Sequence, residues 1–188
     1  TNNFNEDKNL VIQLIIATIP IIILGYIFRD LISQRIFSIN DIAISNLIFA
    51  SILLFAFLNN KGKKTLINIT ILGACFIGLF QCFALIPGAS RSGAAITAGL
   101  LIGLSLKDAS KFAFLLAIPT ILGALTLLIF DLNNGNVSFD LLNISIGFFT
   151  SMIFAFFTIK LFLKLVEKIV MIPFVAYRFL LGILLLII

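Results

Sequence analysis

The residues best suited to chemistry lie together in one short segment, Pro87-Gly88-Ala89-Ser90-Arg91-Ser92-Gly93. Arg91 is the only charged residue between positions 65 and 106, a stretch that is otherwise mostly apolar. A charge inside a membrane is unfavourable unless it faces protein or water, so such an arginine is a functional hypothesis by default. Proline and glycine break helices and free backbone amides, and a cation, hydroxyls and amides together suit phosphate oxygens. The segment therefore predicts an anion-binding site.

Each polar group of this segment has a chemical use and a structural alternative. The Arg91 guanidinium is a planar fork that can donate to two phosphate oxygens. Ser90 and Ser92 can donate to phosphate or serve as an activated nucleophile. We expect the amides of Ser92, Gly93 and Ala94 to open the returning helix, whose N-terminal partial charge attracts anions. The alternative is that Arg91 pairs with backbone carbonyls at a helix break and that the serines are helix caps.

Four further residues are weaker candidates. Gly88 is expected to present its backbone to the bound ligand. Gln81 either lines the site or serves as a polar contact between packed helices. Thr97 either faces the cavity or bonds back to its own helix. Arg178, near the start of the last apolar run, is interpreted as a side chain that snorkels toward the cytoplasmic surface.

The usual partners of a catalytic site are missing from the apolar runs. The chain has no histidine, and its eight carboxylates lie in loops or at the ends of runs: Glu6, Asp7, Asp30, Asp41, Asp108, Asp131, Asp140 and Glu167. We therefore assign no general base, no catalytic triad and no metal ligand. A phosphate pocket without a base suits either part of a hydrolase or a whole transporter, and both readings stay open.

The composition is that of a membrane protein. Hydrophobic residues make up 61% of the chain and charged residues 11%, against roughly 25% charged residues in soluble domains. Apolar runs of spanning length cover residues 10–28, 42–58, 112–130, 141–163 and 172–188. The net charge of +5 is scattered over short loops, which argues against nucleic-acid binding. We predict an all-α polytopic membrane protein with about five transmembrane helices, in which residues 1–188 form a single domain.

The long apolar stretch 66–106 is predicted to be a re-entrant helical hairpin. Its second limb, residues 94–106, would be about 20 Å long as a helix, too short to cross a hydrocarbon core of about 30 Å. Basic joints at residues 61–64 and 107–111 flank the stretch, and both belong on the cytoplasmic side. The stretch then enters and leaves on one side, with the Arg91 segment at its tip. The alternative is a single kinked, tilted helix.

The remaining joints and two of the runs extend this topology. Residues 131–140 lack Lys and Arg and are expected outside, whereas Lys160, Lys164 and Lys168 are expected inside. Pro20 with Gly25 and Pro119 with Gly123 occupy similar places in two runs. Such pairs occur in inverted-repeat bundles, although ordinary use of Pro and Gly explains them equally well.

The chain resembles one family in three places. The first is Gln81-Cys82-Phe83-Ala84-Leu85-Ile86 together with the Arg91 segment that follows it. The others are Phe112-Ala113-Phe114-Leu115-Leu116-Ala117-Ile118-Pro119 and Ile172-Pro173-Phe174-Val175-Ala176-Tyr177-Arg178-Phe179. These segments are similar to those of the undecaprenyl-diphosphate phosphatases, the bacitracin-resistance family. The resemblance covers essentially the whole chain, against about the C-terminal two thirds of the family.

The resemblance implies a hydrolase of the bacterial inner membrane. It would convert undecaprenyl diphosphate to undecaprenyl phosphate, which recycles the lipid carrier for peptidoglycan synthesis and gives resistance to bacitracin. It also implies an inverted repeat with two re-entrant hairpins, a site open toward the periplasm, and dependence on a divalent cation, magnesium or calcium. Arg91 would hold the diphosphate, with Ser90 and Ser92 in the same pocket. The partners would be the polyprenyl diphosphate lipid and the membrane, and a homo-oligomer stays open.

The chain departs from the family's pattern in two places. The family's first hairpin carries a glutamate-rich motif followed by Pro-Val-Ser-Ser-Thr-Gly-His, and neither is present here. The family has Thr where this chain has Ala95, and Thr97 lies two residues further on. The chain also begins with Thr1 rather than Met, and its first residues are mostly polar. We therefore expect an N-terminally truncated chain that lacks activity of its own.

We adopt the phosphatase reading over two alternatives. A polyprenyl-phosphate transporter or flippase would need the same anion pocket but no general base. A non-catalytic membrane scaffold would need neither. Glutamates and a histidine in a second re-entrant segment before Thr1 would favour hydrolysis, and their absence would favour transport.

Overall fold

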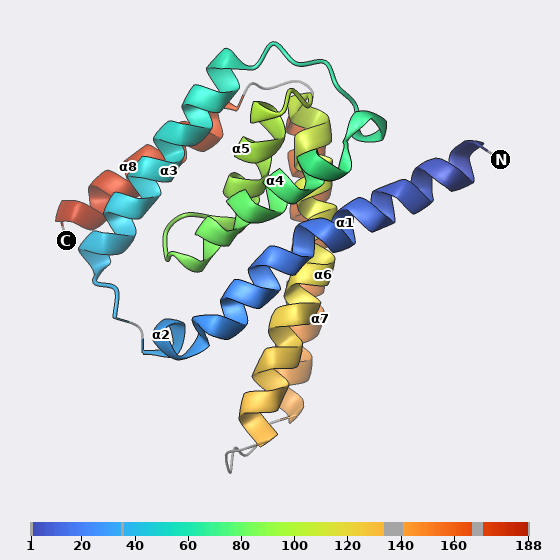
Figure 1. Ribbon diagram of the computed structural model, residues 1–188. Coiled ribbons are helices and arrows are strands. Elements are labelled where there is room, and N and C mark those ends of the chain that lie inside the picture. Colours follow the sequence, from blue (N-terminus) through green and yellow to red (C-terminus); the bar gives the residue numbers. More distant parts are fainter. Residues whose placement is uncertain (1, 35, 134–140, 167–170, 188) are drawn as a thin grey trace.

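The structure is a computed structural model that describes residues 2–34, 36–133, 141–166 and 171–187, and these residues form helices joined by short loops (Figure 1). The helices are α1 (Asn2–Ile27), α2 (Arg29–Ser33), α3 (Ile39–Asn59), η1 (Leu66–Asn68), α4 (Ile71–Gln81), η2 (Cys82–Leu85), α5 (Arg91–Leu101), α6 (Leu106–Asn133), α7 (Leu141–Val166) and α8 (Ile172–Ile187). The described residues contain no strand beyond one isolated bridge. The predicted all-α fold is confirmed for this part of the chain.

Each of the five predicted transmembrane runs corresponds to a helix. Four of these helices, α1, α3, α6 and α7, are long and apolar enough to cross a membrane. The fifth, α8, has 16 residues and is therefore about 24 Å long, shorter than the hydrocarbon core. Large apolar side chains are exposed along all five helices, as expected for surfaces that face lipid. Residues 134–140 and Lys168, for which we predicted a side of the membrane, lie outside the described residues.

Polar residues at the ends of the apolar runs determine where several helices begin. At the start of α3 the Asp41 carboxylate accepts from the Ser38 amide (2.9 Å), and the Asp41 amide donates to the Ser38 hydroxyl (3.2 Å). At the start of α6 the Asp108 amide donates to the Ser105 hydroxyl (3.1 Å), and that hydroxyl donates to the Asp108 carboxylate (2.7 Å). These reciprocal bonds satisfy amides that have no partner within the helix.

Residues 64–105 fold back on themselves as a helical hairpin. At its base the Lys64 amide donates to the Gly103 carbonyl (3.1 Å), and the Ser105 amide donates to the Lys64 carbonyl (2.9 Å). The Asn60 side chain donates to the carbonyls of Leu100 and Leu104, both at 2.9 Å. The two ends of the stretch are therefore neighbours, which excludes the alternative of one kinked helix. That the hairpin enters and leaves the membrane on one face stays a prediction.

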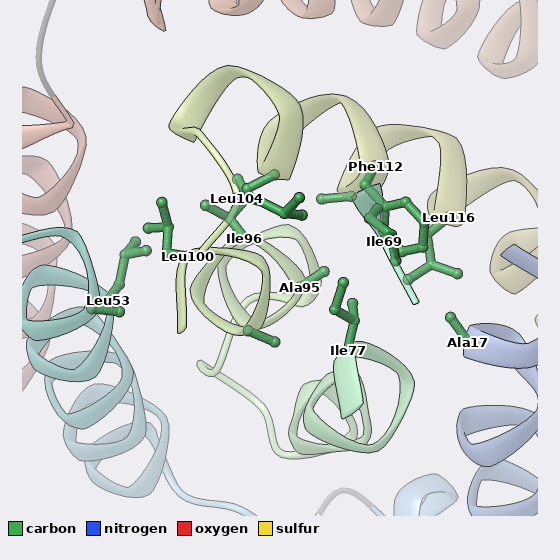
Figure 2. Close-up of a cluster of buried hydrophobic side chains, with 14 of the residues drawn as sticks. Ala17, Leu53, Ile69, Ile77, Ala95, Ile96, Leu100, Leu104, Phe112 and Leu116 are labelled. Atoms are coloured by element: carbon green, nitrogen blue, oxygen red, sulfur yellow. The ribbon is translucent and has the colours of Figure 1, made fainter. Parts of the chain in front are cut away.

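The returning helix α5 is the centre of the packed core. Its residues from Gly93 to Leu100 are all buried. Figure 2 shows Ala95, Ile96 and Leu100 of this helix surrounded by side chains of the neighbouring helices: Leu53 of α3, Ile77 of α4, and Phe112 and Leu116 of α6. Close packing on all sides holds the helix in one position, so the core fixes the place of the Arg91 segment at its N-terminal end.

The two helices that contain an internal proline pack against each other. Pro20 lies inside α1 and Pro119 inside α6, and the helices cross in Figure 1. A side chain at Gly123 would come within 2.9 Å of the Ile22 side chain. The glycine therefore allows the helices to approach each other, while the inverted repeat itself stays a prediction.

Cysteine labelling tests the membrane topology of the hairpin. We expect Lys63→Cys and Lys107→Cys, each in a protein with Cys75 and Cys82 replaced, to react equally with a membrane-impermeant thiol reagent. The physical reason is that the Lys64 backbone is hydrogen-bonded to Gly103 and Ser105. These bonds place both basic joints, residues 61–64 and 107–111, at one end of the hairpin. Labelling of the two cysteines from opposite sides of the membrane would contradict the re-entrant hairpin.

Candidate functional site

The predicted anion site is a strained loop at the N-terminus of α5. The loop, residues 87–90, follows η2 and includes Gly88 with a φ of 93° and Ser90 with a φ of 70°. Among the described residues, Ser90 is the one non-glycine residue with a positive φ. Such a conformation costs about 1–3 kcal/mol and is concentrated at functional sites. The surrounding structure therefore holds this backbone in a conformation that the isolated sequence would not prefer.

Ser90 caps α5, and its bonds determine which amides remain free. The Gly93 amide donates to the Ser90 hydroxyl (3.2 Å), and the Ala94 amide donates to the Ser90 carbonyl (2.9 Å). The amides predicted at Gly93 and Ala94 are thus engaged in the structure. The amides of Arg91 and Ser92 lie in the first helical turn, where no intrahelical acceptor exists. These two amides are the ones that an anion could occupy, together with the helix dipole.

The Arg91 guanidinium is held only weakly by the protein. It is half-buried, and its one hydrogen bond to a described residue is a long contact of 3.5 Å to the Ala117 carbonyl in α6. That distance is at the limit of a hydrogen bond. The contact resembles the structural alternative, in which Arg91 pairs with a backbone carbonyl, but it uses one donor of five. Most of the planar donor fork is therefore available to a ligand.

The two serines differ in what their hydroxyls already do. Ser90 accepts the capping bond described above, as the structural alternative predicted. Ser92 is half-buried and its hydroxyl has no hydrogen bond to any described residue. Ser92 is thus the freer of the two hydroxyls for donating to phosphate or for nucleophilic attack. No imidazole or carboxylate of the described residues contacts it, so the site as described contains no general base.

Gln81 and Thr97 are buried and engaged with the protein. The Gln81 amide donates to the Thr120 hydroxyl of α6 (3.3 Å), and its carbonyl oxygen is buried with no partner among the described residues. The Thr97 hydroxyl donates to the Gly93 carbonyl of its own helix (2.7 Å). Both side chains thus follow the structural reading that the sequence left open, and a direct part in binding substrate stays a prediction.

Arg178 does not snorkel to a surface, and that interpretation is wrong. Its side chain is 4% exposed and lies between α3 and the loop. Nε donates to Asn46 Oδ1 (2.8 Å), and Nη2 donates to the carbonyls of Gly88 (2.8 Å) and Ala89 (3.2 Å). Figure 1 shows why this is possible, since α8 runs alongside α3. Sequence reasoning missed Asn46 as a neighbour of the site and considered Arg178 only as a weaker candidate that would snorkel.

The described residues do not suit a divalent cation. They contain no group of three or more His, Cys, Asp or Glu side chains that could bind a metal. The carboxylates of Asp41 and Asp108 instead accept hydrogen bonds at helix starts. Magnesium and calcium require several oxygen ligands, so we assign no metal to this part of the chain.

Comparison with known proteins agrees with the geometry. A family model described as "Bacitracin resistance protein BacA" matches residues 1–184. The chain belongs to the bacitracin-resistance family. A relative from Alcanivorax borkumensis, named undecaprenyl-diphosphatase, is 41% identical over 182 residues, which are 97% of this chain and 69% of the relative. A relative of the same name from Bacillus subtilis is 37% identical over 185 residues, 96% of this chain and 67% of the relative.

Membership of the bacitracin-resistance family confirms the resemblance found in the sequence. The match includes the loop and α5, as well as α6, which contacts Arg91 through Ala117, and α8, which contacts the loop through Arg178. The relatives are longer, and this chain spans about two thirds of their length.

Proposed function

We propose that this protein removes the terminal phosphate of undecaprenyl diphosphate, yielding undecaprenyl phosphate and inorganic phosphate. The observation that carries the proposal is that the Arg91 guanidinium has one long hydrogen bond, while Arg91 itself opens a helix whose first two amides have no intrahelical acceptor. The names of the relatives support the same reaction. The product is the lipid carrier that peptidoglycan synthesis uses again, and its recycling gives resistance to bacitracin.

The loop contributes positioning and charge stabilisation. The Arg91 fork donates to oxygens of the diphosphate, and the amides of Arg91 and Ser92 donate to the phosphate that lies at the helix end. The bond from the terminal phosphorus to the bridging oxygen breaks, the bridging oxygen stays on the lipid phosphate, and water supplies the new oxygen of inorganic phosphate. Donors fixed where negative charge develops are the main protein contribution to phosphoryl transfer.

An apolar pocket next to the loop suits the lipid part of this substrate. It is lined by residues of α1, α2 and the hairpin, among them Leu85 and Ile86, which directly precede Pro87 in the sequence. Its other lining residues are Leu24, Phe28, Leu31, Ile32, Phe37, Leu79, Cys82 and Phe83. Because the polyprenyl chain enters from the hydrocarbon of the membrane and not from water, the gain there comes from van der Waals packing against these side chains. We place the first isoprene units of the polyprenyl chain in this pocket.

The setting of the reaction follows from the proposal. We assign the protein to the bacterial inner membrane as a multi-pass protein, with the site open toward the periplasm. Dependence on magnesium or calcium and association into homo-oligomers stay predictions.

Phosphate release in detergent micelles tests this function. We expect the full-length protein to convert undecaprenyl diphosphate into undecaprenyl phosphate and an equimolar amount of inorganic phosphate, measured by chromatography of the lipid and a phosphate assay. A micelle has no two compartments, so transport cannot produce this signal. Intact substrate in micelles, combined with movement of the lipid across vesicle membranes, would contradict hydrolysis and support a transporter.

A further inference from the structure

Arg178 connects three segments that are far apart in the sequence. Besides its bonds to the Gly88 and Ala89 carbonyls, Nη2 lies 3.3 Å from the Asn46 carbonyl. The Asn46 side-chain amide donates in return to the Arg178 carbonyl (2.7 Å). The arginine and asparagine therefore hold each other in both directions, and together they tie the loop to α3 and α8. Nothing in the reaction proposed above uses either residue.

The charge of Arg178 is not balanced within the contacts that hold it. Every hydrogen-bond acceptor of its side chain is the neutral oxygen of an amide: Asn46 Oδ1 and three backbone carbonyls. Nη1 is buried and has no partner among the described residues. An unpaired buried charge is strongly unfavourable, so a purely structural link between α3 and the loop would be more stable with a neutral donor.

The unpartnered nitrogen points toward the anion site. A Cβ atom added to Gly93, in the first turn of α5, would lie 3.0 Å from Arg178 Nη1 and 3.1 Å from the Ser90 hydroxyl oxygen. Arg178 Nη1 therefore lies close to the first turn of α5, at the helix end where the Arg91 and Ser92 amides are available to an anion. Its positive charge adds there to the helix dipole and to the charge of Arg91.

We propose that Arg178 is a positioning residue of the diphosphate site, which fixes the loop through the Gly88 and Ala89 carbonyls and whose unbalanced charge increases the affinity for the diphosphate. The inference rests on the proposed function for the identity of the anion. Drawing both loop carbonyls back toward Arg178 keeps the loop in the strained conformation that presents the Arg91 and Ser92 amides. The buried charge lowers the free energy of an anion at the helix end, because Coulomb interactions are weakly screened away from water.

Two substitutions separate the charge from the hydrogen bonds. Arg178→Met removes both the charge and the hydrogen bonds. We expect it to weaken equilibrium binding of inorganic diphosphate to the full-length protein by at least about tenfold, because the attraction between one positive charge and an anion several ångströms away is lost. Arg178→Lys keeps the charge but cannot hold Asn46 and the loop at once. It should bind diphosphate within about threefold of the unchanged protein while kcat for undecaprenyl diphosphate falls at least about tenfold.

A stability-matched control makes the result specific. Val175→Ala removes buried methyl groups one turn earlier on α8, so it should lower the unfolding temperature without changing diphosphate binding. Equal diphosphate affinity in Arg178→Met and the unchanged protein would overturn the proposal, and so would equal weakening in Val175→Ala. If Arg178→Met does not insert, weak diphosphate binding by a folded Arg178→Lys would overturn it. Loss of diphosphate binding in Arg178→Met, with no phosphate release by the unchanged protein, would reject the phosphatase function but support the charge effect.

Discussion

Replacing Gly88 by alanine should reduce kcat/KM for undecaprenyl diphosphate by at least about 10²-fold, the size of effect that misplacing a catalytic group by one ångström can have. Gly88 has a φ of 93°, which an L-residue adopts only with strain. The added Cβ would also overlap the Ile42 carbonyl oxygen of α3. Because that oxygen is backbone, α3 and the loop must move apart. The movement would pull the Gly88 carbonyl away from Arg178 and displace the amides that open α5.

A second glycine on a lipid-facing helix provides the matched control. Gly147 lies in α7, and a Cβ added there would meet no atom within 4 Å. Alanine is also about 1 kcal/mol more favourable than glycine in a helix. Gly147→Ala should therefore retain full phosphate release in the same assay. Full activity in Gly88→Ala would show that the close approach of the loop to α3 does not matter for the site.

The sequence predicted the helices well because the signals for them are local. Apolar runs and the polar joints that separate them depend only on neighbours within a few residues. The hairpin was predicted for a similar reason, since the length of its second limb and its flanking lysines are read directly. The last apolar run, residues 172–188, likewise corresponds to a helix with nearly the same bounds, Ile172–Ile187.

The sequence draws attention to the centre of the candidate site but gives little signal for its edge. The segment around Arg91 stands out because one charge in an apolar stretch requires an explanation. Arg178 carries the same charge, but in the sequence it lies near the start of the last apolar run, close enough to a membrane surface for snorkelling. Its partner Asn46 is 132 residues away, and no local pattern pairs the two. The positive φ of Ser90 is likewise imposed by packing, and serine itself gives no signal for it.

The bonds of Gln81 and Thr97 illustrate the same limit. Both residues are polar and close to the Arg91 segment, so the sequence makes them equally good as ligands or as packing contacts. The choice depends on which face of the helix meets α6 and which carbonyl is within reach. Only the tertiary arrangement determines that.

Replacing Arg91 by lysine should have the second large effect. Lysine keeps the charge but replaces the planar fork by one ammonium group, which cannot bind two phosphate oxygens in parallel. Losing one preorganised donor to a developing charge typically costs about 10²–10³-fold in rate. Folding should be nearly unaffected, by less than about 1 kcal/mol, because the hydrogen bond lost is the long contact to Ala117. Arg29→Lys is the matched control, since Arg29 lies at the exposed start of α2 and pairs there with Asp30.

The most direct measurement is kcat/KM for undecaprenyl diphosphate in the full-length protein and its Arg91→Lys and Arg29→Lys variants, each with its unfolding temperature. The arrangement of the loop predicts a loss of at least about 10²-fold for Arg91→Lys, no loss for Arg29→Lys, and unfolding temperatures close to that of the unchanged protein. Turnover by a folded Arg91→Lys variant equal to that of the unchanged protein would contradict the assignment of Arg91 to the diphosphate and return it to a structural part at the start of α5.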